Sequence, residues 1–163
     1  MVFGVSIVGR SDTGKTRLIM RLIPELVGRG YKIAVVKDCP HGFDLDAEGK
    51  DSWNFARVGA QGVMLNSPER IGLIKNVEEE MTGTILLEKY FHDVDIVLIE
   101  GLRDETGIKK IELLRRGIHE IKESLIEETI AYVCDFHLEA ERPVFTPDDI
   151  VDIANLIEGY MEE

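Results

Sequence analysis

Residues 2–19 read VFGVSIVGRSDTGKTRLI, and this stretch decides the fold. It opens with a short apolar run that ends in glycine, which is typical of a buried strand, and continues after residue 16 with apolar residues at helical spacing. Between them lies Gly-x-x-x-x-Gly-Lys-Thr, which in a strand–loop–helix context is a phosphate-binding P-loop. Its two glycines let consecutive backbone N–H groups point inward at phosphate oxygens. The stretch therefore predicts that the chain binds a nucleoside triphosphate.

The residues of this loop have different predicted tasks. We expect Lys15 to reach the β- and γ-phosphates, as a catalytic residue, and the Thr16 hydroxyl to bind Mg²⁺. Asp12 lies beside phosphates that repel a carboxylate, so it either faces solvent or acts on the transferred group or a partner chain. The predicted nucleotide-binding residues of this stretch are Gly9, Arg10, Ser11, Asp12, Thr13, Gly14, Lys15, Thr16 and Arg17.

Strand-like and helix-like segments alternate along the rest of the chain. The predicted strands cover residues 2–8, 31–36, 62–66, 71–75, 95–101, 110–114 and 129–134. The predicted helices cover residues 16–27, 52–57, 82–91, 119–128 and 146–160, with Asp51 or Ser52 capping the second and either Thr82 or Thr84 starting the third. Right-handed crossovers then give an α/β fold, a P-loop NTPase three-layer sandwich with a mainly parallel sheet and helices on both faces. We expect residues 1–163 to form a single nucleotide-binding domain.

Composition excludes several classes of function. The net charge of −12 argues against binding nucleic acid or anionic membranes, which rests on clustered lysines and arginines. No apolar stretch approaches the roughly 20 residues that span a bilayer, and the first residues lack the features of a signal peptide. Two cysteines are too few for a disulfide framework. We therefore expect a cytoplasmic protein that binds neither nucleic acid nor membranes.

A second site is predicted where the strand over residues 95–101 ends. Ligands of open α/β sheets bind at the carboxyl ends of parallel strands. Glu100 lies there, so it would hold the hydration shell of Mg²⁺ or orient a water for attack on the γ-phosphate. Asp95 begins the same strand and is rejected as the metal ligand because it lies at the opposite end. Asp38, at the end of the second strand, is expected to be a further group around the magnesium ion.

The polar segment 38–52 is the third candidate site, because loops of this length inside a compact domain are usually functional or mobile. Lys50, Asp51 and Ser52 open a helix and could form a second anion site at its N-terminus. Cys39 and His41 are two soft metal ligands, whereas a structural zinc site needs four. Contact of His41 and its neighbours with a substrate or partner is therefore favoured over metal capture.

Recognition of the base depends on a residue near the end of the sheet. The Asn-Lys-x-Asp signature for guanine is absent. Asp135 ends the last predicted core strand, and its carboxylate could accept hydrogen bonds from N1 and N2 of guanine, which adenine cannot donate. Arg103, shortly after Glu100, is either a phosphate contact or a surface arginine.

The colinear order of these pieces resembles the molybdopterin-guanine dinucleotide biosynthesis protein B family. The resemblance covers nearly the whole chain, and its most specific piece beyond the P-loop is Gly49-Lys50-Asp51-Ser52-Trp53. The remaining pieces are Val36-Lys37, residues 41–46, Gly59-Ala60, residues 67–70, residues 95–101, Lys110-Ile111-Glu112 and the strand ending at Asp135. Asp38 stands where the family usually has histidine, only His41 remains of a pair of loop histidines, and Leu102-Arg103 replaces Phe-Lys.

This resemblance implies a GTP-binding adapter with weak hydrolysis. Its partners would be a second copy of the chain, the nucleotidyltransferase that joins GMP to molybdopterin, and molybdopterin or its guanine dinucleotide. Weak hydrolysis agrees with the absence of an obvious arginine finger or water-positioning glutamine in the sequence. Two alternatives remain. A small-molecule P-loop kinase would need a basic lid, for which Arg115-Arg116 is the only arginine pair, and a metallochaperone GTPase would need more His and Cys ligands.

Overall fold

The computed structural model describes residues 2–43, 46–117 and 126–162, and it divides the chain into two compact units. The first unit comprises Met1–Asp38 and Thr82–Glu163, and the second comprises Cys39–Met81. Each unit is described by itself below. A single nucleotide-binding domain over the whole chain stays a prediction.

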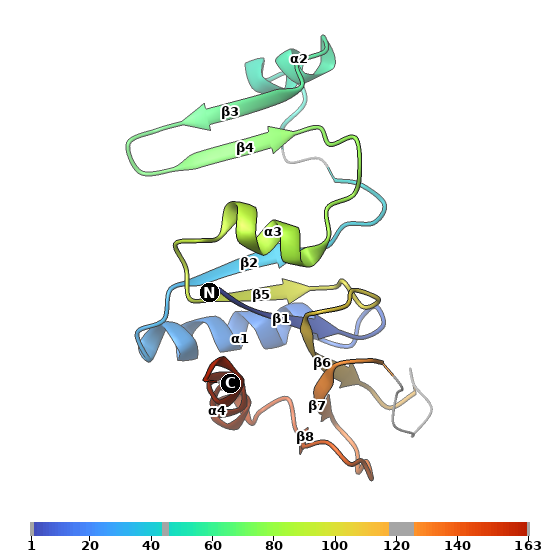
Figure 1. Ribbon diagram of the computed structural model, residues 1–163. Helices are drawn as coiled ribbons and strands as arrows, with labels where there is room; N and C mark the ends of the chain where they lie inside the picture. Colours follow the sequence, from blue (N-terminus) through green and yellow to red (C-terminus); the bar gives the residue numbers. More distant parts are fainter. Residues whose placement is uncertain (1, 44–45, 118–125, 163) are drawn as a thin grey trace. The chain divides into compact units, whose positions relative to one another are not determined.

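The first unit contains a six-stranded sheet in the order β2-β5-β1-β6-β7-β8, in which every neighbouring pair is parallel (Figure 1). Its strands are β1 (Phe3–Val8), β2 (Ile33–Lys37), β5 (Ile96–Glu100), β6 (Lys109–Leu114), β7 (Thr129–Cys134) and β8 (Val144–Phe145). The predicted parallel sheet is confirmed. Sequence patterns missed β8, because a two-residue strand has no periodicity to detect.

Helices cover both faces of this sheet. Alternate residues such as Val5, Ile7 and Leu98 pack with α1 (Lys15–Gly28) and α4 (Ile150–Met161). On the opposite face, Val97 and Ile99 pack with Leu87 of α3 (Gly83–Tyr90). Figure 1 shows α1 and α4 on one side of the sheet and α3 on the other. The predicted α/β sandwich is therefore confirmed.

The predicted helix starts agree with the structure at α3 but not at the last helix. Thr82 caps α3 by accepting a hydrogen bond from Ile85 N at 3.3 Å, in agreement with the predicted start. The start predicted for the last helix is wrong, because Asp149 Oδ2 accepts a hydrogen bond from Thr146 N at 2.7 Å. This turn satisfies the backbone locally and delays the helix to Ile150. The helix predicted over residues 119–128 falls mostly on residues 118–125, outside the described residues.

The second unit consists of α2 (Asp51–Arg57) and a hairpin of β3 (Gly62–Asn66) and β4 (Ile71–Lys75). Both strands match the predicted ranges, and they pair antiparallel in a sheet of their own. The predicted cap of α2 is wrong, because Lys50 takes the N-cap position without a side-chain hydrogen bond. No residue of α2, β3 or β4 is buried, so this unit has no core of its own within the described residues.

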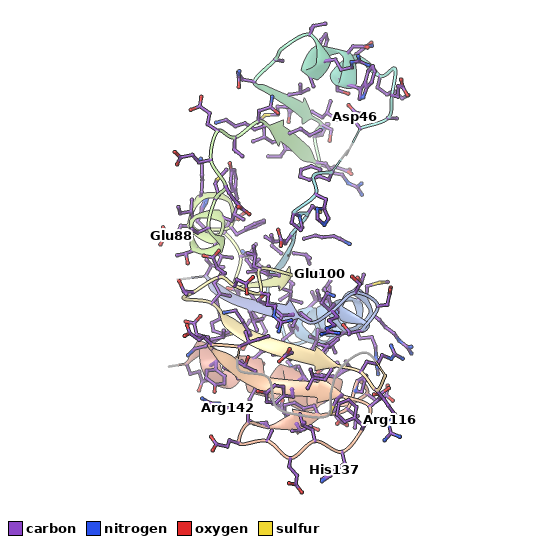
Figure 2. The ribbon with its side chains drawn as sticks, turned by 90° about the vertical axis from the view of Figure 1, so that its right-hand side faces the viewer. Asp46, Glu88, Glu100, Arg116, His137 and Arg142 are labelled. Atoms are coloured by element: carbon purple, nitrogen blue, oxygen red, sulfur yellow. The ribbon has the colours of Figure 1, made fainter. Side chains whose placement is uncertain are left out.

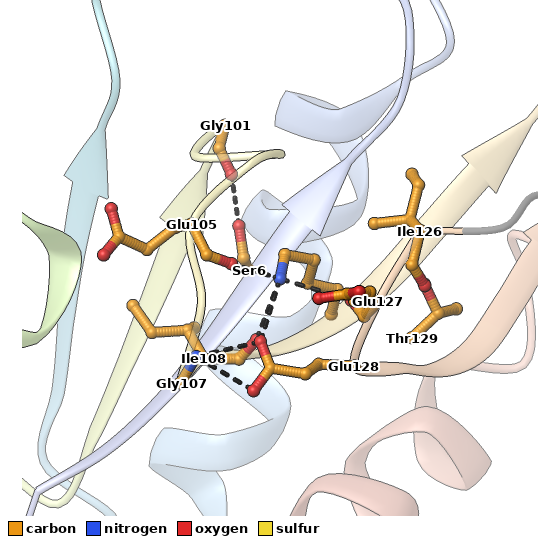
Figure 3. A network of polar contacts seen from close by, with 10 residues as sticks. Ser6, Gly101, Glu105, Gly107, Ile108, Ile126, Glu127, Glu128 and Thr129 are labelled. Carbon is orange, nitrogen blue, oxygen red and sulfur yellow. Dashed lines mark hydrogen bonds and ion pairs between the residues drawn. The ribbon is translucent and has the colours of Figure 1, made fainter.

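A buried lysine joins β6 to the segment before β7 in the first unit. Lys110 is 1% exposed, and its Nζ donates to the carbonyl oxygens of Ile108 and Glu127, both at 3.3 Å, and to that of Glu105 (Figure 3). It also lies 3.2 Å from Glu128 Oε2, and both oxygens of Glu128 accept from Gly107 N at 2.9 Å. This network neutralises a charge that would otherwise be costly to bury.

The lowered pKa of Glu128 predicts how the free energy of unfolding changes in acid. Burial raises the pKa of Glu128, but the hydrogen bonds from Gly107 and Lys110 outweigh burial and hold the pKa below its ordinary value of 4.5. The stabilisation is fully present above about pH 4.5 and is lost as the pH falls through the lower folded-state pKa. Glu128→Gln should therefore lower the free energy of unfolding by about 1–2 kcal/mol at pH 7 and flatten its decline in acid.

Urea unfolding at a series of pH values measures this effect. The exposed neighbour Glu127 supplies the matched control, because Glu127→Gln keeps the carbonyl that Lys110 contacts. An acid profile of Glu128→Gln that coincides with that of the unsubstituted protein would contradict the assignment.

Candidate functional site

The loop between β1 and α1 has the backbone geometry that phosphate binding needs. Gly9 and Gly14 have φ angles of 146° and 99°, a region that residues with a side chain rarely adopt. A Cβ atom on Gly9 would lie 2.7 Å from the carbonyl oxygen of Leu113, so no other residue fits there without movement. Gly14 is the N-cap of α1 and has no side chain to occupy the first N–H groups. These groups are oriented for an anion at the positive end of the helix dipole.

Side chains within the loop complete this cradle. Lys15 Nζ donates to the carbonyl oxygens of Gly9 and Arg10 at 3.0 and 2.8 Å, which places the ammonium group over the loop. Thr13 is buried, and its hydroxyl donates to Arg10 O at 2.9 Å, which closes the loop from inside. Asp12 is exposed and has a φ of 61°, in agreement with the solvent-facing alternative for its side chain.

A carboxylate from β5 meets the start of α1. Thr16 Oγ1 donates to Glu100 Oε2 at 2.8 Å, although 84 residues separate them in the sequence. Glu100, labelled in Figure 2, ends β5, whereas Asp95 precedes this strand and accepts from Lys32 N at 2.8 Å. The two acids therefore lie at opposite ends of β5, as predicted. A hydroxyl and a carboxylate at this separation fit Mg²⁺, which takes few protein oxygens and completes its shell with phosphates and waters.

Asp38 lies beside the turn that follows Glu100. Its backbone N donates to Glu100 O at 2.9 Å, and its Oδ2 lies 3.4 Å from Leu102 N. Gly101 has a φ of 113°, and a Cβ atom added to it would be 2.6 Å from the Cβ of Asp38. The structure thus brings Asp38 next to Glu100, while its role around a magnesium ion stays a prediction.

Two pockets lie on either side of the start of α1 and share Gly14 and Arg17. The first is lined by Ser11, Asp12, Gly14, Lys15, Thr16, Arg17 and Glu100. The second contains Thr13, Gly14, Arg17, Arg21, Arg115 and Asp135, with apolar walls from β6 and β7. Seven of the nine predicted loop residues, all except Gly9 and Arg10, therefore line one or both pockets, together with Glu100 and Asp135.

Asp135 lies at the edge of the second pocket, where its carboxylate has two neighbouring partners. Its Oδ1 accepts from Arg116 N at 3.2 Å, and its Oδ2 lies 3.7 Å from Arg115 Nε. On the opposite wall, Arg21 donates to Asp148 Oδ1 at 2.7 Å and to the carbonyl oxygen of Pro147 at 2.6 Å. The last helix thus supplies part of the pocket through the turn that precedes it.

The other predicted site residues lie elsewhere. Arg103 is 3.8 Å from Glu112 Oε1, a buried carboxylate, and lines a different pocket with Glu105 and Glu127. The segment residues His41, Lys50, Asp51 and Ser52 belong to the second unit. His41 is exposed, and Lys50 precedes a helix of only seven residues. No group of three or more His, Cys, Asp or Glu in the described part of the chain could hold a metal ion.

Sequence reasoning missed three cations at this site: Lys37, Arg21 and Arg115. Lys37 Nζ lies 3.7 Å from Glu100 Oε1, and the two arginines pair with aspartates around the second pocket. Lys37 and Arg115 could have been found by the rule that identified Glu100, because each stands at or directly after the carboxyl end of a parallel strand. Arg21 had no such signal, since it depends on the packing of α1 near α4.

Comparison with known proteins gives a consistent result. The family described as Molybdopterin guanine dinucleotide synthesis protein B matches residues 4–135. The molybdopterin-guanine dinucleotide biosynthesis adapter protein of Haemophilus influenzae is 32% identical over 158 residues, which are 96% of this chain and 88% of the relative. The Escherichia coli protein of the same name is 31% identical over 158 residues, which are 94% of this chain and 90% of that relative.

Solved structures of proteins with this family name are similar to this chain over nearly its whole length. A crystal structure of molybdopterin-guanine biosynthesis protein B has a TM-score of 0.76 at 31% identity and covers 99% of this chain and 100% of its own. The structure of Bacillus subtilis MobB has a TM-score of 0.73 at 24% identity, covers 96% of both chains and supports the fold.

The contact between Asp38 and Gly101 predicts that glycine is required after Glu100. Gly101→Ala should lower the free energy of unfolding by roughly 2–4 kcal/mol, because the methyl group meets Asp38 and the φ angle is strained. Gly28→Ala is the matched control, since nothing lies within 4 Å of its added Cβ and it ends a helix. Denaturant unfolding compares the two, and equal stabilities would contradict the close approach of β2 and β5 at this end.

Proposed function

This chain belongs to the family of molybdopterin guanine dinucleotide synthesis protein B, and we propose that it serves molybdopterin-guanine dinucleotide biosynthesis as an adapter that binds GTP with Mg²⁺. One observation carries the nucleotide assignment. A pocket with phosphate-binding geometry and a pocket that contains the Asp135 carboxylate share Gly14 and Arg17. A nucleotide that runs across α1 would place its phosphates in the first pocket and its base in the second.

The phosphate half of the site uses groups already in position. The N–H groups at the start of α1 and the Lys15 ammonium would bind the phosphates, while Thr16 and Glu100 would hold the magnesium ion and its waters. When bound, Mg²⁺ would neutralise part of the phosphate charge. Arg17 borders both pockets and adds a further cation near the phosphates.

The base half favours guanine. A carboxylate accepts hydrogen bonds but donates none, and guanine presents donors at N1 and N2 where adenine has none. Arg115 and the backbone N–H of Arg116 restrain Asp135, so its carboxylate needs little reorganisation to meet such donors.

An adapter needs partners more than fast chemistry. No glutamine lines the phosphate pocket among the described residues, which supports hydrolysis that is at most slow. The second unit exposes large apolar side chains, including Phe43 at 64%, Val58 at 85% and Ile71 at 73%. Exposed apolar surface of this kind favours contact with another protein. We therefore assign contact with the nucleotidyltransferase and with molybdopterin or its dinucleotide to the second unit, which includes His41, Lys50, Asp51 and Ser52. The surface that would bind a second copy of the chain is not assigned.

No helix within the described residues has the length and apolar character needed to cross a membrane. A cytoplasmic location remains a prediction. The kinase and metallochaperone alternatives have no specific observation in their favour.

Calorimetric titration with Mg²⁺ tests the nucleotide site. The unsubstituted protein should bind GTP in preference to ATP, and Lys15→Ala should weaken GTP binding at least about tenfold, because a charge-assisted contact to phosphate is lost. Equal binding of GTP by the two proteins would exclude the P-loop as the binding site.

The base assignment requires a separate comparison. Asp135→Asn should erase the preference for GTP over ATP, a change of about tenfold or more, since the amide replaces one acceptor oxygen by a donor. Glu139→Gln, which changes an exposed acid outside both pockets, should keep the preference. An unchanged preference in Asp135→Asn would show that another residue reads the base.

A further inference from the structure

Strand β2 ends in a cation beside the carboxylate of β5. Lys37 pairs with Glu100 in the parallel register, and Lys37 Nζ lies 3.7 Å from Glu100 Oε1. The Lys37 side chain is 63% exposed, whereas that of Glu100 is 16% exposed. The lysine therefore stands on the solvent side of a carboxylate that the fold holds in place.

Side chains alternate between the two faces along a strand, and this alternation places the side chains of Lys37 and Glu100 on the face that α1 covers. Ile33 of β2 and Leu98 of β5 belong to the core that α1 and α4 cover, and Lys37 and Glu100 follow them at even spacing. The other carboxylate oxygen of Glu100, Oε2, accepts a hydrogen bond from Thr16 Oγ1 at 2.8 Å. One carboxylate thus connects Lys37 to the residue that is expected to bind magnesium.

Lys37 can change partners at little cost. Exposed ion pairs contribute little to stability, because solvent screens them and the long lysine side chain loses freedom. A magnesium ion near Thr16 and Glu100 would repel the ammonium group and compensate the carboxylate charge. The terminal phosphate of a triphosphate carries more charge than a single carboxylate and offers more acceptor oxygens, so it is the stronger partner.

We propose that Lys37 binds the γ-phosphate of GTP when Mg²⁺ replaces it at Glu100, and that it thereby distinguishes GTP from GDP. This inference rests on the proposed nucleotide site. Lys15 would discriminate less between GTP and GDP, because the P-loop lysine reaches the β-phosphate, which both nucleotides carry, as well as the γ-phosphate. Lys37 would approach the phosphates from β2, on the far side of Glu100 from the P-loop strand β1. The proposal therefore places selectivity for the third phosphate at the end of β2.

Titration calorimetry with a non-hydrolysable GTP analogue and with GDP, each with Mg²⁺ and with a chelator, tests this role. Lys37→Met should weaken binding of the triphosphate about tenfold in Mg²⁺ and that of GDP less than about twofold. Lys37→Arg should restore most of the difference because it keeps the charge. Lys32→Met is the matched control, since Lys32 is an exposed lysine just before the opposite end of β2.

The possible outcomes separate this inference from the proposed function. Equal weakening of the triphosphate and of GDP in Lys37→Met would overturn the inference, because it would indicate a general structural or electrostatic effect. Unchanged triphosphate binding would overturn it as well, while normal GTP binding by the unsubstituted protein and its loss in Lys15→Ala would leave the proposed function intact. If the unsubstituted protein binds neither nucleotide, both proposals fail together.

Discussion

The parallel register of three neighbouring strands is the constraint on which the site depends. Ile7 of β1, Glu100 of β5 and Lys37 of β2 lie in one row across the sheet. A shift of β5 by one residue would send Glu100 to the opposite face and separate it from Thr16. Hydrogen bonds from Gly101 N to Ile7 O at 3.2 Å and from Asp38 N to Glu100 O at 2.9 Å continue the pairing beyond the strands. The buried hydroxyl of Ser6 also donates to Gly101 O.

Helix packing then sets the position of the P-loop over this row. Buried residues of α1, such as Leu18 and Leu22, pack on the sheet together with Ile153 and Ile157 of α4. Arg29, just after α1, donates to Glu25 of the same helix and to Glu158 of α4. The hydrogen bonds to Glu25 and Glu158 outweigh partial burial, which lowers the pKa, so the pKa of Arg29 is raised. The bond to Glu158 also connects the two helices. Because Asp148, in the turn before α4, also lines the second pocket, the segment that leads into α4 contributes to the same site as α1.

Local sequence patterns were sufficient for much of this architecture. The P-loop and the apolar run before Glu100 have short-range signatures, and the hairpin strands at 62–66 and 71–75 were found at their observed bounds. Failures occurred where a neighbour elsewhere in the chain or a competing turn decided the outcome. Strand β8 exists because it pairs with β7, and α4 begins late because Asp149 closes a turn on Thr146. Neither effect has a helical or strand period to detect.

The sequence by itself determined the loop that binds phosphate and the acid at the end of β5, because glycine conformations and strand polarity are local properties. Only the tertiary structure decided which charged groups meet there. The pairs Thr16–Glu100, Lys37–Glu100 and Arg115–Asp135 join residues on different elements, and Arg21–Asp148 spans 127 positions. Such pairs depend on strand order and helix packing, which arise from burial summed over the whole core rather than from any short segment.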